Sequence, residues 1–126
     1  MPAQLNHTIV AARDSRASAT FLTEILGLPA PVRFGPFQVV EAANGASLDF
    51  ADRDDITPQH YAFLVSEAEF DEIFARIRER GLTWYADPGG GRPGEINTRD
   101  GGRGVYWHDP DGHSLEILTR PYGSGG

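Results

Sequence analysis

Two histidines and two carboxylates stand at equivalent places in a sequence that repeats itself. Residues 44–50, NGASLDF, return 67 residues later as residues 111–117, DGHSLEI, and each copy has a carboxylate at its sixth position. Upstream of each copy, a histidine lies in an apolar strand-like segment that precedes a helical pattern. The four candidate ligands are His7, His60, Asp49 and Glu116. Imidazole and carboxylate groups bind divalent metals, so the duplication predicts a metal site shared between two modules.

Each candidate also has an ordinary structural explanation. A single histidine on an apolar face is more often a hydrogen-bonded core residue, and a single carboxylate can pair with an arginine or lie at a sheet edge. The coincidence of all four in equivalent positions favours the metal site. Two further histidines are weaker candidates: we expect His113 at the surface and His108 either in a turn or at the rim of the pocket.

The elements that must position these residues repeat as well. In module one, residues 5–10 read as a strand, and Asp14 or Ser15 can cap a helix that Gly27 ends. The predicted apolar stripe of this helix is Ala17, Phe21, Leu22, Ile25 and Leu26. Three strands should follow, at Val32–Phe34, Phe37–Ala42 and Ala46–Ala51.

Module two restarts the pattern after a charged connector, residues 52–58. A strand is expected over residues 60–65, and Ser66 with Glu69 forms a capping box for a helix that Gly81 ends. Its apolar stripe is Phe70, Ile73, Phe74 and Ile77, and the three following strands are expected at Leu82–Ala86, Val105–Trp107 and Ser114–Leu118. We therefore predict an α+β chain of two tandem β-α-β-β-β modules, residues 4–52 and 59–120, with a tail at 121–126. We expect residues 123–126 of this tail to be disordered.

Alternation along the strands predicts which face carries the chemistry. Leu48 and Phe50, like Leu115 and Ile117, should pack under the helices, which leaves the candidate ligands on the opposite, concave side of curved mixed sheets. The extra length of module two falls in the glycine-rich segment 87–104, which is either a flexible surface loop or a loop that covers the substrate.

Composition narrows the function classes. The 126 residues carry a formal net charge of −7, which argues against nucleic acid as a partner. No cysteine is present, so a metal would be held by histidine, carboxylate and water. The longest apolar run is too short to span a bilayer and no secretory signal is visible, so the expected location is cytoplasmic.

At this point the chain resembles the vicinal oxygen chelate superfamily, which includes glyoxalase I, fosfomycin and bleomycin resistance proteins and extradiol dioxygenases. The resemblance covers about residues 5–118. It rests on the duplicated modules and on four short segments: Leu5-Asn6-His7, Leu26-Gly27-Leu28, Asp109-Pro110-Asp111-Gly112 and Leu115-Glu116-Ile117.

The resemblance implies a divalent-metal enzyme, glyoxalase-like or dioxygenase-like, acting as a Lewis acid on a small substrate with vicinal oxygens. It makes His7, His60 and Glu116 the metal ligands, with Glu116 also catalytic, and Asp49 falls where glyoxalase I has a longer glutamate. The metal could be Zn, Ni, Mn, Co or Fe(II). A bleomycin-resistance-type protein that binds a small molecule without catalysis is the alternative.

Small members of the superfamily usually pair, so the resemblance also implies a homodimer in which each site takes ligands from both chains. Closure of the two modules within one chain is the other arrangement. For the substrate pocket, we consider Trp107 as an apolar wall and Arg92 and Arg103 as anchors for an anionic group. Their ordinary roles would be core packing and solvated loop charge.

Overall fold

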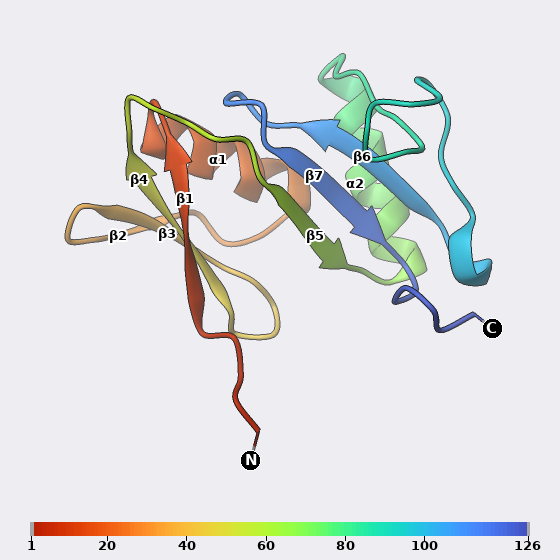
Figure 1. The fold of residues 1–126 in the computed structure, drawn as a ribbon, viewed down its shortest axis with the longest axis horizontal. Helices are drawn as coiled ribbons and strands as arrows, with labels where there is room; N and C mark the ends of the chain where they lie inside the picture. Colours follow the sequence, from red (N-terminus) through yellow and green to blue (C-terminus); the bar gives the residue numbers. More distant parts are fainter. Residues whose placement is uncertain (1, 126) are drawn as a thin grey trace. The chain divides into compact units, whose positions relative to one another are not determined.

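The computed structural model describes residues 2–125, which form two compact units divided between Thr57 and Pro58. Each unit has one α-helix and one mixed sheet (Figure 1). Among the described residues, no helix has the length and apolar character needed to cross a membrane.

Unit 1 confirms the predicted β-α-β-β-β order. Its elements are β1 (His7–Ala12), α1 (Ser15–Leu26), β2 (Val32–Phe34), β3 (Phe37–Glu41) and β4 (Ser47–Asp52). The sheet order is β1-β4-β3-β2, with β1 parallel to β4 and the other neighbours antiparallel. The parallel pair requires a crossover, and α1 with the β2–β3 hairpin supplies it.

Helix α1 begins and ends where the sequence predicts, but only Leu22 and Ile25 of its predicted apolar stripe are buried. Asp14 caps the first turn by accepting from the Ala17 amide at 3.0 Å, and Gly27 closes the helix at φ 73°. The buried positions are Ser15, Ser18, Ala19, Leu22, Thr23 and Ile25. The predicted stripe was therefore wrong at Ala17, which is exposed, and at Phe21 and Leu26, which are only half-buried. Small serine and alanine side chains let the helix approach the sheet closely, which the apolar pattern does not reveal.

Unit 2 repeats this plan with one strand fewer. It contains β5 (His60–Leu64), α2 (Glu67–Glu79), the short 3₁₀ helix η1 (Arg99–Gly101), β6 (Gly104–His108) and β7 (Ser114–Leu118). The sheet order is β5-β7-β6, with β5 parallel and β6 antiparallel to β7. The capping box at the start of α2 is present, with Ser66 and Glu69 each bonding the other's backbone amide.

The predicted strand over residues 82–86 was wrong, because only Tyr85 pairs with β6, through an isolated bridge to Tyr106. Its neighbours bond to the following loop instead. The Ala86 amide donates to the Arg92 carbonyl, and the Gly94 amide donates to the Trp84 carbonyl. The backbone groups that would have extended a strand along β6 are thereby used within segment 84–94.

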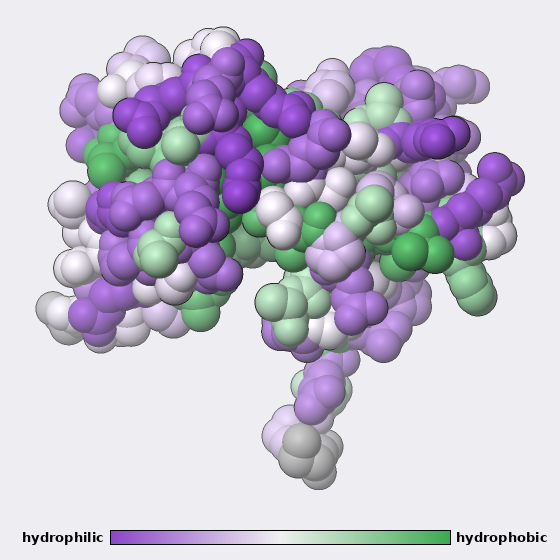
Figure 2. Space-filling model, turned by 180° about the vertical axis from the view of Figure 1, so that it is seen from behind, coloured by the Kyte–Doolittle hydropathy of each residue, from purple (hydrophilic) through white to green (hydrophobic). Residues whose placement is uncertain are grey.

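The core of each unit lies on the sheet face that the sequence predicts. Leu48 and Phe50 in β4, and Leu115 and Ile117 in β7, are all buried. Helix α1 packs against β1, β3 and β4, and α2 buries Phe70, Ile73 and Ile77 (Figure 1). Seen from behind, the surface is largely hydrophilic, consistent with helices that turn their polar sides outward (Figure 2).

The two sheets share the same register at the candidate ligands. In unit 1, His7 is paired with Ser47 and Ile9 with Asp49. In unit 2, His60 is paired with Ser114 and Ala62 with Glu116. Paired residues of neighbouring strands lie on one face of a sheet, so each unit places its histidine and its carboxylate on the same face, one row apart.

Candidate metal centre

Two candidate ligands meet in unit 2. Nε2 of His60 lies 2.9 Å from Oε1 of Glu116. Two atoms that each bind one metal ion at about 2.0–2.2 Å, at roughly right or tetrahedral angles, are separated by about 3 Å. The imidazole nitrogen and the carboxylate oxygen thus have both the chemistry and the spacing of neighbouring ligands of a divalent metal.

The two side chains differ in their access to solvent. The His60 side chain is 42% exposed, whereas that of Glu116 is 1% exposed. A carboxylate buried to this degree is costly unless its oxygens accept hydrogen bonds or bind a cation. Glu116 meets this requirement with His60 on Oε1 and with the Tyr122 hydroxyl, at 2.5 Å, on Oε2.

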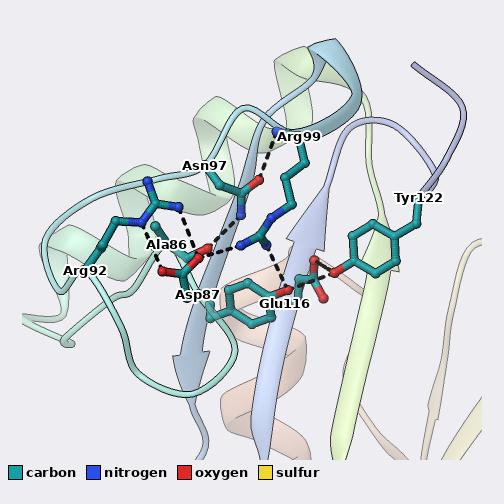
Figure 3. Close-up of polar contacts among 8 residues, drawn as sticks. Ala86, Asp87, Arg92, Asn97, Arg99, Glu116 and Tyr122 are labelled. Atoms are coloured by element: carbon teal, nitrogen blue, oxygen red, sulfur yellow. Dashed lines mark hydrogen bonds and ion pairs between the residues drawn. The ribbon is translucent and has the colours of Figure 1, made fainter. Parts of the chain in front are cut away.

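The hydrogen bonds beyond Glu116 run in one direction (Figure 3). Each phenol has a single O–H, so Tyr122, which donates to Glu116, must accept from Tyr106 at 2.8 Å. Arg99 has no acceptor atom and donates to the Tyr106 hydroxyl at 3.4 Å. Successive donors Arg99, Tyr106 and Tyr122 therefore end on the carboxylate of Glu116.

Both phenols are held in their neutral form. Burial raises the pKa of Tyr122 far above its usual value, and the hydrogen bond to Glu116 raises it further. Burial also raises the pKa of Tyr106. The ring of Tyr122 is exposed, but its hydroxyl lies against a buried carboxylate, where a phenolate would add a second negative charge.

Segment 87–104 is tied to this chain of donors by salt bridges. Asp87 accepts two hydrogen bonds from Arg92, both at 3.0 Å, and one from Arg99 at 2.5 Å. The Asn97 amide donates to the Ala86 carbonyl at 2.8 Å (Figure 3). The loop is thus fastened on the ligand-bearing side of β6, the side on which Tyr106 lies.

Unit 1 arranges its candidate ligands differently. Nδ1 of His7 lies 2.7 Å from Oδ1 of Asn6, which leaves Nε2 as the ring nitrogen for a metal. Asp49 does not reach His7 but accepts a hydrogen bond from the Ser47 hydroxyl at 2.9 Å. Among residues 2–125, no group of three or more histidine, aspartate or glutamate side chains is close enough to hold a metal ion. Each unit alone therefore supplies only part of the predicted ligand set.

The predicted substrate contacts have structural partners of their own. Trp107 is fully buried on the face of β6 opposite Tyr106, and its indole N–H has no hydrogen-bond partner within residues 2–125. Arg103 bonds Glu67 at 2.7 Å and Asp71 at 2.8 Å on α2, and it stacks on the Phe70 ring. Arg92 pairs with Asp87. Burial and ion pairs thus give all three residues structural roles.

The remaining histidines divide between surface and interior. The expectation that His113 lies at the surface was wrong, because it is 1% exposed. Its Nδ1 accepts from the Gln59 amide at 2.9 Å, and its own amide donates to the carboxylate of Asp109, so it ties the start of β5 to the β6–β7 turn. His108 is exposed and stacks edge-on against Tyr85.

Sequence reasoning missed Tyr122 and Arg99, the two residues outside the strands that reach Glu116 directly or through Tyr106. Tyr122 directly precedes residues 123–126, which the sequence predicts to be disordered. That prediction was wrong for residues 123–125, which form hydrogen-bonded turns; Gly126 lies outside the described residues. A single tyrosine beside a glycine-rich end carries no periodic signal. Only the contact with Glu116 identifies it.

Comparison with known proteins identifies relatives of this chain. Residues 4–117 match the Glyoxalase/Bleomycin resistance protein/Dioxygenase superfamily. The chain is 70% identical to the solved structure of Oxidase ChaP-H1, covering 96% of this chain and 98% of that one with a TM-score of 0.94. It is 68% identical to Oxidase ChaP-H2 over the whole of both chains, with a TM-score of 0.96.

A more distant relative is the glutathione transferase FosA of Serratia marcescens, 31% identical over 90% of this chain and 78% of that protein. The fosfomycin resistance protein FosX of Listeria monocytogenes, 20% identical with a TM-score of 0.76 over both whole chains, shares the fold. The duplicated register, the resemblance seen in the sequence and the matched span agree, and the chain belongs to the Glyoxalase/Bleomycin resistance protein/Dioxygenase superfamily.

Proposed function

We propose that this chain is a metal-dependent oxidase that acts on a small substrate with vicinal oxygen atoms and uses dioxygen as the electron acceptor. The observation that carries the proposal is the His60–Glu116 pair, whose ligand atoms lie 2.9 Å apart on the face of the unit 2 sheet opposite Leu115 and Ile117. The identity of 70% to a protein named as an oxidase supports this reaction class over the others in the superfamily.

The proposed ligands are His7, His60 and Glu116. Two imidazoles and one carboxylate are the set that non-haem Fe(II) oxygenases use, and Zn, Ni, Mn or Co could also bind it. When bound, such a metal supplies a Lewis acid with open positions where vicinal oxygens chelate, and as Fe(II) it also supplies redox chemistry. We propose Fe(II) for this chain, because reduction of dioxygen needs a redox-active metal, which excludes zinc, and because this ligand set is typical of non-haem Fe(II) oxygenases.

Asp49 is proposed to stay outside the ligand set. Its carboxylate is one methylene shorter than that of Glu116 and is bonded to Ser47. Glu116, with its longer side chain, bonds His60 instead of Ser114, the residue that corresponds to Ser47. The Ser114 hydroxyl has no hydrogen-bond partner among the described residues.

The chain's own residues would then prepare the site. Asn6 fixes the ring of His7 through Nδ1, and Glu116 is held by Tyr122. We propose that the face carrying His60 and Glu116 binds the substrate, while Tyr122 holds Glu116 by a hydrogen bond and Tyr106 holds Tyr122 in turn.

A homodimer would complete the ligand set. Since neither unit alone brings together three ligands among the described residues, we propose that His7 of one copy joins His60 and Glu116 of another. Pairing of two copies by their isologous surfaces would create two such sites at once.

A second candidate is a thiol transferase, which the 31% identity to the FosA protein supports. A third is a protein that binds a small molecule without catalysis. The test is to load metal-free protein with Fe(II) without oxygen, then measure dioxygen consumption with catechols and hydroxycarbonyl compounds. Consumption that requires both Fe(II) and Glu116 would support the oxidase. Turnover of fosfomycin with glutathione, without oxygen uptake, would support the transferase, and bound substrate without either reaction would support the binding protein.

A further inference from the structure

The carboxyl-terminal segment 120–125 contacts the proposed metal ligand Glu116 through a single residue. Tyr122 follows β7 by only a few residues and turns back so that its hydroxyl lies 2.5 Å from Oε2 of Glu116. This oxygen is the one that His60 does not contact. The phenol and the imidazole therefore hold the two oxygens of one buried carboxylate separately.

The segment is fixed at its other end by Asp100. The carboxylate of Asp100 accepts from the amide of Gly123 at 3.1 Å and from that of Gly125 at 3.3 Å. Asp100 itself has a φ of 56°, in the left-handed region that non-glycine residues adopt at a cost. Such local strain persists where the surrounding contacts hold it, and here those contacts bind the turn that carries Tyr122.

The same turn is reinforced within itself. The Ser124 hydroxyl donates to the Pro121 carbonyl at 2.6 Å, and Arg120 donates to the Ser124 carbonyl at 3.1 Å. Tyr122 thus lies in a turn that is stabilised by its own hydrogen bonds. Arg99, the residue before Asp100, donates to the Tyr106 hydroxyl. Two neighbouring residues of η1 therefore hold the two tyrosines: Arg99 bonds Tyr106, and Asp100 bonds the turn that carries Tyr122.

We infer that Tyr122 is a positioning residue for Glu116 and that Asp100 anchors the segment that presents it. By occupying Oε2, the phenol directs Oε1 alone toward the metal side, beside Nε2 of His60. Glu116 would then offer a single oxygen, Oε1, to a bound metal. This inference rests on the metal site proposed above.

Co(II) is a suitable probe, because its visible absorption reports the number and arrangement of its ligands. We would titrate metal-free protein with Co(II) for the wild type, Tyr122→Phe and Asp100→Asn. The matched control is Tyr61→Phe, which removes the same oxygen from the opposite face of the same sheet. Asparagine tolerates the left-handed conformation, so Asp100→Asn removes the charge with little change in backbone preference.

Loss of a partner that orients a metal ligand typically weakens metal binding about 10- to 100-fold. We expect a Kd increase in this range for Tyr122→Phe with an altered Co(II) spectrum, a smaller change in the same direction for Asp100→Asn, and none for Tyr61→Phe. An unchanged Kd and spectrum in Tyr122→Phe would overturn the positioning role. An unchanged Asp100→Asn beside a weakened Tyr122→Phe would overturn the anchoring role.

If Tyr122→Phe fails to fold, as judged by circular dichroism, Asp100→Asn carries the test alone, and an unchanged Kd and spectrum there overturn the inference. Failure of this inference is distinct from failure of the proposed function. If wild-type protein binds no Co(II), the metal site itself is absent. If wild-type protein binds Co(II) and the variants have the same Kd and spectrum, only the inference about Tyr122 and Asp100 is lost.

Discussion

Asp49 holds the register position in unit 1 that Glu116 holds in unit 2, but its carboxylate is turned to Ser47 rather than to a histidine. We therefore expect Asp49→Asn to weaken metal binding by less than about tenfold, the lower end of the effect of residues outside the ligand set. Glu116→Gln should weaken it far more, because a ligand charge is lost. Calorimetric titration of both variants with Mn(II) checks this, and equal losses would make Asp49 a ligand.

The proposed homodimer predicts complementation between two damaged chains. His7→Ala and His60→Ala should each bind metal poorly when alone. After the two are unfolded together and refolded, mixed dimers should contain one site with both histidines intact, so metal uptake should partly return. A mixture that binds no more metal than its separate components would place both histidines of a site on the same chain.

Trp107 should matter for stability and not for substrate. It is fully buried, so Trp107→Ala should lower the free energy of unfolding by about 3–5 kcal/mol, the usual cost of removing a large core side chain. Urea denaturation followed by far-ultraviolet circular dichroism measures this loss. The milder Trp107→Phe should leave the KM for any identified substrate unchanged. A raised KM in that variant would return Trp107 to the binding site.

Segment 87–104 should loosen in acid. Hydrogen bonds from Arg92 and the charges of Arg92 and Arg99 hold the pKa of Asp87 below its usual value. A carboxyl group with a lowered folded-state pKa contributes stability that is complete above its unfolded pKa, about 3.9, and is lost as the pH falls through the folded value. Amide NMR shifts of residues 88–103 should therefore begin to change below about pH 4. Asp87→Asn should show the loosened spectrum already at neutral pH; matching wild-type spectra would contradict this role.

The fold was largely predictable because duplication and alternation act locally. The Asn44-Gly45 turn, the Ser66 capping box and the alternating strands are short-range signals, and they gave the correct strands in unit 1 and the buried face of both sheets. The strand expected at residues 82–86 failed for a non-local reason. Its backbone bonds are taken by the loop that follows, and sequence periodicity does not show which partner a strand-like segment will choose.

The candidate site was predictable only in part. The register confirms that each histidine and carboxylate share a sheet face, because strand position fixes that face. The sequence could not show that the Ser47 hydroxyl bonds Asp49 while the Ser114 hydroxyl has no partner among the described residues. This difference depends on the side chain of Glu116 being one methylene longer than that of Asp49. Tyr122, Arg99 and Asp100 come from irregular segments and meet Glu116 through tertiary contacts, which leave no trace in spacing.

The most direct test of the proposed centre is calorimetric titration of metal-free protein with Fe(II) in the absence of oxygen. We predict saturable binding of about one ion per chain in the wild type, as for a three-ligand site with open positions, and its loss in His7→Ala, His60→Ala and Glu116→Gln. Absence of Fe(II) binding by folded wild-type protein, or equal binding by all three variants, would contradict a metal centre built from these residues.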